Sequence, residues 1–243
     1  MWIICAGMKR SASTWQYMVA SHIVEEHLHG RRCGFAGFHL IQEAEMKATD
    51  KVPRIFKFHG KNVALGLLAE SGAASVIYCY RDIRDVAVSL MEKMSVDFEH
   101  LMGLRILERL VEGDKFWRNQ RAVLVQRYER IVTNSIESIF EIANHLGVDV
   151  ALGYVEDLAA RYSLEKNKAR CRSIADSLER DGLNLTQHYA TAPCFRDTFS
   201  ELHWNHISSG NSERWRIQLS LEQQRKLNDM FKDWLEINRY SLV

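Results

Sequence analysis

The sequence predicts an α/β protein built on a parallel sheet that helices flank on both faces. Four short apolar runs are typical of buried strands, at residues 2–6, 55–58, 75–80 and 123–126. Segments with helical periodicity separate these runs, and strands that alternate with helices pair in parallel through right-handed crossovers. The 243 residues are 47% hydrophobic and 26% charged, which is the composition of one ordinary globular domain.

The helices expected between the strands carry apolar stripes and end signals. The first stripe consists of Trp15, Met18, Val19 and Ile23. Gly30 is expected to end that helix. A later stripe consists of Ile136, Ile139, Phe140 and Ala143. Asn134 and Glu137 form a capping pair before it, and Gly147 follows it.

The last helix has the clearest signals, and the segment before it has the weakest. A capping box from Ser220 to Gln223 begins the last helix. Its expected buried stripe is Leu227, Met230, Phe231, Trp234 and Leu235. Residues 160–205 are less regular, and we expect the segment from about residue 150 to 205 to form a helical or irregular cap. The cap belongs to a single domain of residues 1–243.

Composition excludes several classes of protein. The longest apolar runs have seven residues, whereas a membrane-spanning helix needs about 20. Five cysteines without a C-x-x-C pair favour buried thiols in a reducing cytoplasm over disulfides or a zinc site. The formal net charge of +1 argues against nucleic-acid binding. A small basic excess in the first 84 residues suits either a small anionic ligand or an ordinary solvated surface.

The turn after the first strand favours anion binding. The segment Gly7-Met-Lys-Arg-Ser-Ala-Ser-Thr-Trp15 leads directly into a helix. Such a turn leaves backbone N–H groups unpaired beside the positive end of the helix dipole. Arg10 adds a guanidinium, and the hydroxyls are those of Ser11, Ser13 and Thr14.

The same turn departs from the usual triphosphate-binding pattern. Its spacing is close to G-x-x-x-x-G-K-[ST], with Ala12 in place of the second Gly and Ser13 in place of the Lys. Without that Lys, a nucleotide triphosphatase lacks its main contact to the terminal phosphates. The alternative is a plain strand–turn–helix with Lys9 and Arg10 as an exposed basic pair.

Five segments, in order along the chain, resemble the sulfotransferases that use 3′-phosphoadenosine-5′-phosphosulfate (PAPS). Arg10-Ser-Ala-Ser-Thr-Trp15 resembles the family's 5′-phosphosulfate loop, [KR]-[ST]-G-[ST]-T-[WL]. The other four are Pro53-Arg-Ile-Phe-Lys-Phe-His59, Tyr80-Arg-Asp-Ile-Arg-Asp-Val-Ala-Val-Ser89, Val125-Gln-Arg-Tyr-Glu129 and Gly210-Asn-Ser-Glu-Arg-Trp-Arg216. The resemblance implies a P-loop-kinase-like three-layer sandwich. It also implies direct in-line transfer of a sulfuryl group, without a metal, to a hydroxyl or amine of a small-molecule, lipid or carbohydrate acceptor.

The resemblance implies catalytic roles for His59, Lys57 and Arg10. Because Lys57 and His59 are two residues apart on a strand, both point to the same side. His59 would be the general base, since the ordinary pKa of histidine, near 6.5, suits neutral pH. Lys57 and Arg10 would stabilise the leaving phosphate. The alternative for His59 is a hydrogen-bonded, half-buried histidine without a catalytic role.

The cofactor implied is PAPS, with 3′-phosphoadenosine-5′-phosphate (PAP) as product. The expected cofactor-binding residues are Lys9, Arg10, Ser11, Ala12, Ser13, Thr14, Trp15, Arg81, Ser89, Tyr128, Ser208, Ser209 and Gly210. Arg81 and Ser89 would hold the 3′-phosphate. The alternative makes Arg81 and Arg84 surface partners of Asp82 and Asp85.

The aromatic side chains of these segments have two interpretations. Trp15 and Tyr128 would stack on adenine, or else they are core aromatics. Trp215 is expected in the core.

Several positions depart from the family pattern. Ala12 stands where the loop Gly is usual, which should narrow the loop slightly, and Phe58 replaces a Thr. Ser208 and Ser209 replace a basic pair, so the 3′-phosphate is expected to be held with fewer charges and Arg81 to carry a larger share. The family's dimer motif is not recognisable, which leaves the oligomeric state open.

The acceptor is expected to bind under the cap. An apolar wall of Tyr189, Phe195, Phe199 and Trp204 would favour an aromatic or lipid-like alcohol, although the same residues could form the cap's own small core. Two rival functions remain at this point. One is a small P-loop kinase-like phosphotransferase, and the other is a non-catalytic nucleotide-binding relative.

Overall fold

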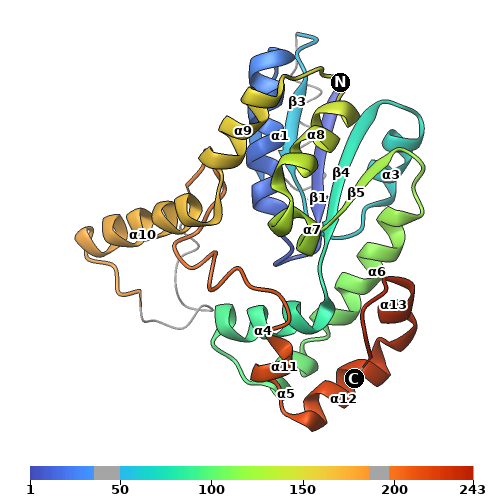
Figure 1. Cartoon of the computed structure of the whole chain (residues 1–243), viewed down its shortest axis with the longest axis vertical. Coiled ribbons are helices and arrows are strands. Elements are labelled where there is room, and N and C mark those ends of the chain that lie inside the picture. The colour runs from blue at the N-terminus through green and yellow to red at the C-terminus, as the bar shows by residue number, and fades with distance from the viewer. Residues whose placement is uncertain (36–49, 186–196, 243) are drawn as a thin grey trace.

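A parallel β-sheet forms the centre of the fold (Figure 1). In this computed structural model, which describes residues 1–35, 50–185 and 197–242, the strand order is β2-β3-β1-β4-β5 and each neighbouring pair runs parallel. The strands are β1 Trp2–Gly7, β2 Arg31–Phe35, β3 Arg54–Lys57, β4 Ala74–Tyr80 and β5 Val123–Arg127. The predicted α/β class with a parallel sheet is confirmed.

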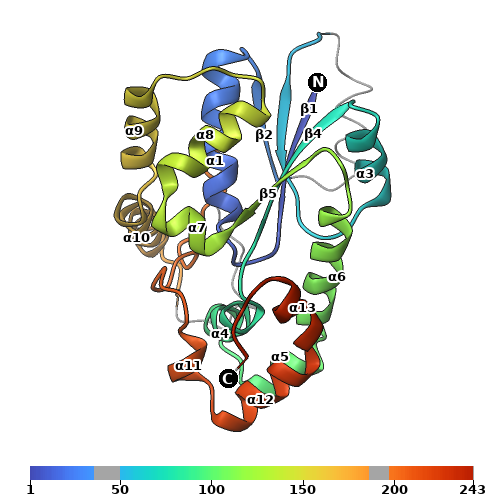
Figure 2. The ribbon, with the colours of Figure 1, turned by 45° about the vertical axis from the view of Figure 1, so that its right-hand side comes forward.

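Helices cover both faces of this sheet (Figure 2). On one face α1 and α8 pack against the strands, and α9 lies outside α8; on the other face lie α3 and α6. Helices α4, α11 and α12 lie beyond the carboxyl ends of the strands. The helices of the described residues are α1 Ser13–His27, α3 Val63–Glu70, α4 Ile83–Met94, α5 Phe98–Gly103, α6 Ile106–Arg118, α7 Tyr128–Thr133, α8 Ser135–His145, α9 Leu152–Arg161, α10 Leu164–Arg180, α11 Trp215–Gln218, α12 Leu221–Met230 and α13 Lys232–Ile237.

The central strands bury both of their faces. Along β1, Ile3 and Cys5 belong to the apolar cluster under α1 and α8, while Ile4 and Ala6 belong to the cluster on the opposite face. A strand covered on both sides needs apolar residues at consecutive positions rather than at alternate ones. This is why uninterrupted apolar runs predicted β1, β3, β4 and β5 correctly.

The edge strand β2 was not predicted. Its residues alternate between exposed and half-buried, so they form no apolar run. It is held largely by polar contacts: the Arg32 guanidinium donates to Glu25 at 2.8 Å and to the carbonyl of Phe199 at 2.8 Å. Arg32 also lies 3.8 Å from the centre of the Phe199 ring. Strand β2 therefore connects the sheet edge to the chain around Phe199.

Two expectations for the second half of the chain were wrong in detail. The expected single C-terminal helix is interrupted at Phe231, which separates α12 from α13. Met230, the last residue of α12, is 45% exposed, whereas Trp234 and Leu235 of α13 are buried as expected. The segment described as less regular contains α10, a regular helix of 17 residues.

Both predicted capping arrangements are present. Asn134 accepts the backbone N–H of Glu137 at the start of α8, and Ser220 and Gln223 form the capping box of α12. Within residues 1–35, 50–185 and 197–242, no helix has the length and apolar character required to cross a bilayer.

Candidate functional site

Two cavities open where the strands end. The smaller has a volume of about 400 Å³, and its walls come from the loop after β1 and the start of α1, from Arg81 and Ser89, and from residues within the segments 128–135, 159–167 and 202–210. The larger has a volume of about 1000 Å³ and lies over the end of β3. Arg10, Ser13 and His206 line both cavities, so these three residues mark the place where the cavities meet. Ligands of open parallel sheets bind at this edge.

The loop between β1 and α1 is held tightly against β4. A Cβ on Gly7 would lie 2.7 Å from the Cβ of Ser13 and 2.9 Å from the Cys79 sulfur, so only glycine fits there. The Met8 N–H donates to the carbonyl of Cys79 at 2.9 Å. The Ser11 Oγ lies 2.6 Å from the Met8 carbonyl oxygen and 3.1 Å from that of Cys79. The hydroxyl of Ser11, an expected cofactor ligand, is therefore buried in this anchor.

The same loop contains two residues in a left-handed conformation. Arg10 and Ala12 each have a φ of 68°. Ala12 is the N-cap of α1, and no side chain caps this end of the helix in the described part of the chain. The first backbone N–H groups of α1 are therefore available to an anion, next to the positive end of the helix dipole.

Lys57 and Thr14 meet at the start of α1. The Lys57 side chain is buried, and its Nζ donates to the hydroxyl oxygen of Thr14. Nε2 of His206 lies 3.0 Å from the same oxygen. Thr14 faces the smaller cavity and Lys57 the larger one.

His59 follows β3 and lines the larger cavity beside Lys57, so the expectation that both point to the same side is met. Its Nδ1 lies 2.8 Å from the carbonyl oxygen of Gly7, which can only accept a hydrogen bond. Nδ1 therefore carries the proton, and the lone pair of Nε2 is left for another partner. Burial, followed by the charge of Lys57, lowers the pKa of His59 to about 3, so the ring is neutral at physiological pH.

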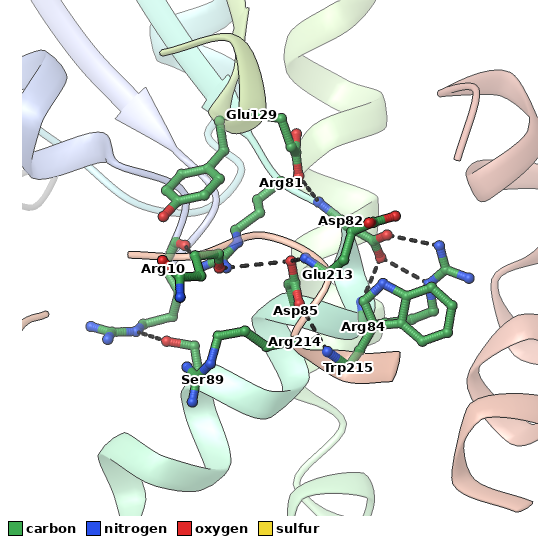
Figure 3. Close-up of polar contacts among 12 residues, drawn as sticks. Arg10, Arg81, Asp82, Arg84, Asp85, Ser89, Glu129, Glu213, Arg214 and Trp215 are labelled. Carbon is green, nitrogen blue, oxygen red and sulfur yellow. Dashed lines mark hydrogen bonds and ion pairs between the residues drawn. The ribbon is translucent and has the colours of Figure 1, made fainter. Parts of the chain in front are cut away.

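Arg10, Ser89 and Arg81 form a second polar group at the smaller cavity (Figure 3). Arg10 Nε donates to the Ser89 hydroxyl at 2.8 Å, and the Arg81 guanidinium donates to the carbonyls of Arg10 at 3.3 Å and Asn211 at 2.7 Å. Burial and the charge of Arg81 lower the pKa of Arg10 to about 10. The half-buried Arg10 guanidinium and the buried Arg81 guanidinium repel each other, and an anion in the cavity would relieve that repulsion.

The acidic residues beside Arg81 have structural roles. Asp85 pairs with Arg81 at 3.4 Å and accepts the backbone N–H groups of Glu213 and Trp215 (Figure 3). Arg84 pairs with Asp82 at 2.7 Å and lies 3.7 Å from the centre of the buried Trp215 ring. The alternative, in which these arginines and aspartates form ion pairs on the surface, was therefore wrong, because the pairs are buried. They fasten the chain after residue 210 to α4. Trp215 is a core residue, as expected.

Most of the remaining expected cofactor residues line the smaller cavity. Trp15, Tyr128, Ser208 and Gly210 line it. The Tyr128 hydroxyl donates to the Gly210 carbonyl at 2.7 Å, and the Tyr128 ring lies 4.0 Å from the Arg81 guanidinium. Ser209 accepts the Asn211 N–H, and Lys9 is exposed at the larger cavity.

The expected apolar acceptor wall is only partly within the described residues. Tyr189 and Phe195 lie outside them. Phe199 is 60% exposed against Arg32, and Trp204 is half-buried. The apolar side chains that line the larger cavity are instead Phe35, Leu90, Met94, Ile106 and Leu110.

Sequence reasoning missed His206. This residue lies in a segment without regular structure, and it contacts Thr14 across 192 positions of sequence. A single histidine in a loop has no spacing pattern, so nothing in the sequence could have marked it. The described residues hold no group of three or more His, Cys, Asp or Glu side chains suited to a metal ion.

The fold and the site together define a P-loop-like α/β protein, in which the loop after β1 and two arginines face a cavity at the carboxyl edge of the sheet. A model of the sulfotransferase domain family matches residues 3–239, and the chain belongs to this family. No curated protein matches the sequence.

Solved structures with the same fold include two of retinol dehydratase. One, in complex with androsterone and the inactive cofactor PAP, has a TM-score of 0.69 and 18% identity, and the match covers 96% of this chain and 80% of that chain. The other, with retinol and PAP, has a TM-score of 0.70 and 19% identity over 96% and 81% of the two chains. Mouse sulfotransferase SULT7A1 complexed with PAP has a TM-score of 0.69 and 15% identity over 96% and 84%.

Proposed function

We propose how this PAPS-dependent sulfotransferase holds its cofactor. The 5′-phosphosulfate binds the loop of residues 9–15 and the start of α1, and the 3′-phosphate binds between Arg81 and Ser89. The observation that carries this proposal is the convergence of two guanidiniums, the half-buried Arg10 and the buried Arg81, on the cavity at the uncapped end of α1. A ligand with two separated phosphates suits this arrangement. The PAP bound to its structural neighbours supports it.

The proposed reaction is a direct in-line transfer. Nε2 of His59 takes the proton of the acceptor hydroxyl while the acceptor oxygen bonds to sulfur. The bond between sulfur and the 5′-phosphate oxygen breaks, and that oxygen keeps the electron pair and leaves as part of PAP. Lys57 and Arg10 stabilise the negative charge that builds on the leaving oxygen. The bond from Nδ1 to the Gly7 carbonyl supports the role of base, because it leaves the lone pair of Nε2 for the acceptor hydroxyl.

The acceptor that we propose has an apolar body and an anionic group. The larger cavity joins an apolar wall to cationic side chains that include Lys61 and Arg109. The loop after β3 is fixed to α6, since Trp117 Nε1 donates to the Gly60 carbonyl at 2.8 Å. A Cβ on Gly113 would lie 4.0 Å from the backbone nitrogen of Lys61, and Arg109 is one turn earlier on the same helix.

This acceptor class adds an anionic group to the aromatic or lipid-like alcohol expected from the sequence, although Glu112 and Glu201 offset part of the cationic charge. A comparison of kcat/KM for a neutral hydroxyaryl compound and for the same compound with a carboxylate tests it. We expect the carboxylate to be preferred and Arg109→Glu to abolish that preference. Lys115→Glu, on the same helix but outside the cavity, should leave it unchanged. Equal kcat/KM for the two acceptors would contradict the proposal.

We also propose that the protein works in the cytoplasm. Cys5, Cys33, Cys79 and Cys171, the cysteines of the described residues, are free thiols, which supports a reducing compartment.

A thermal-shift assay with PAP and Mg-ATP in parallel tests the cofactor assignment. A ligand at a hundredfold excess over its Kd stabilises the native state by about 2.7 kcal/mol. For a domain of this size that raises Tm by roughly 5–10 °C. We expect this shift with PAP. A shift with Mg-ATP alone would instead indicate a phosphotransferase.

A further inference from the structure

His206 occupies the junction of the two cavities. With Arg10 and Ser13 it lines both of them, so it lies next to the place where the sulfuryl group passes from cofactor to acceptor in the proposed function. Its partner Thr14 belongs to the first turn of α1 and faces the smaller cavity. The pair therefore connects the chain after the cap to the phosphate-binding loop.

The hydrogen bonds of His206 fix its tautomer. The backbone N–H of His203 donates to Nδ1 of His206 at 3.4 Å, so Nδ1 carries no proton. Burial, together with the charges of Lys57 and Arg10, holds the pKa of His206 well below its ordinary value, so the ring is neutral. A neutral imidazole has one N–H, which is therefore at Nε2 and donates to the Thr14 hydroxyl oxygen at 3.0 Å.

The Thr14 hydroxyl then has one remaining hydrogen-bonding function. A hydroxyl has one proton to donate and two lone pairs that accept. One lone pair accepts from His206 Nε2 and the other from Lys57 Nζ. The proton cannot point toward either donor and is left for a third partner, on the side of the smaller cavity.

We propose that His206 is a positioning residue that aims the Thr14 proton at the 5′-phosphate end of the cofactor. The inference rests on the proposed function, because it needs an anion on the loop. His206 acts through Thr14: without its N–H, one lone pair of Thr14 is free and the hydroxyl can rotate away. A hydrogen bond to a charged acceptor is among the stronger ones in proteins, so misdirecting it has a measurable effect on binding.

The test is a double-mutant cycle on PAP affinity, measured by calorimetric titration. His206→Leu should weaken PAP binding on the order of tenfold, and Thr14→Val by about ten- to a hundredfold. Both variants impair the same hydrogen bond, the one from the Thr14 hydroxyl to the 5′-phosphate. The double variant His206→Leu/Thr14→Val should therefore bind PAP no more weakly than Thr14→Val alone. His206→Gln, whose amide N–H₂ reaches a similar position, should restore affinity to within about threefold of the wild type.

Two results would overturn the inference. One is an equal loss from His206→Leu in the wild-type and Thr14→Val backgrounds, because His206 would then act independently of Thr14. The other is unchanged PAP affinity in a folded His206→Leu protein, with folding checked by Tm. Failure of the proposed function is distinguishable from both, since the wild-type protein would then not bind PAP at all.

Discussion

Replacing Ala12 with glycine should stabilise this protein, which is the reverse of the usual effect of that change in a helix. Ala12 is held at φ 68° and ψ 19°. A non-glycine residue in this left-handed region costs about 1–2 kcal/mol, because its Cβ approaches the following carbonyl oxygen. Glycine avoids that cost but adds about 0.4–1 kcal/mol of chain entropy to the unfolded state. The net gain is about 0.5–1 kcal/mol of unfolding free energy, or roughly 1–4 °C in Tm.

The assay is thermal denaturation of Ala12→Gly beside a matched control, Ala169→Gly. Ala169 is an exposed residue in the interior of α10 with ordinary helical geometry. There the same substitution should lower the unfolding free energy by about 0.5–1 kcal/mol, because glycine gives up more backbone freedom in a helix. One chemical change should therefore shift Tm in opposite directions at the two sites.

The cofactor gives a second measurement on the same variant. Ala12 lines the smaller cavity, but its methyl group makes no polar contact that an anion needs. PAP should therefore bind Ala12→Gly at least as tightly as the wild type. If Ala12→Gly lowers Tm as much as Ala169→Gly does, Ala12 is not left-handed and the account of the loop is wrong.

Three further predictions concern the site. His59→Ala should lower kcat by about 10²–10⁴ and leave PAP affinity nearly unchanged, and normal turnover of this variant would place the base elsewhere. Lys57→Ala should lower kcat and, more mildly, PAP affinity. In calorimetric titration, Arg81→Ala should weaken the binding of PAP by roughly 10- to 150-fold and the binding of adenosine 5′-phosphate much less. Ser89→Ala should show the same selectivity with a smaller loss. Equal losses for the two ligands would make Arg81 purely structural. Because a base must be unprotonated and the pKa of His59 is low, kcat should fall only at a pH well below 6.5. Lys57→Met removes a charge that lowers that pKa, so its acid limb should move to higher pH; an unmoved limb would assign the titration to another group.

The sheet and the position of the site could be predicted because both depend on strong local patterns. Buried parallel strands require consecutive apolar residues, and their carboxyl ends must meet at one edge, so residues after β1, β3 and β4 were expected together. Strand β2 has no such pattern, because it is half exposed and polar contacts of Arg32 hold it. The break at Phe231 depends on packing against the rest of the fold, which a helical stripe cannot show.

Within the site, residue types were predictable but hydrogen-bond partners were not. Ser11 has the composition of a phosphate ligand, yet its hydroxyl is turned to the Met8 carbonyl. The alternative named Arg81 and Arg84 together as surface partners of Asp82 and Asp85, whereas the burial of the Arg84–Asp82 pair against Trp215 follows only from the position of α11. His206 reaches Thr14 through tertiary structure alone.

The cavity walls come from widely separated parts of the chain, and this has a consequence for folding during synthesis. Thr14 and His206 are 192 positions apart, and Arg81 bonds to Asn211 across 130. Contacts of such long range close large loops and form late, after local structure. When only β1 and α1 of a nascent chain have emerged from the ribosome, the phosphate loop is present but the opposite wall of the smaller cavity is not. The chain gains a complete cavity only when residues beyond 210 follow. Cofactor binding is thus a property of the finished fold, and PAP would serve in cell-free translation as a reporter of the moment when the two ends of the chain meet.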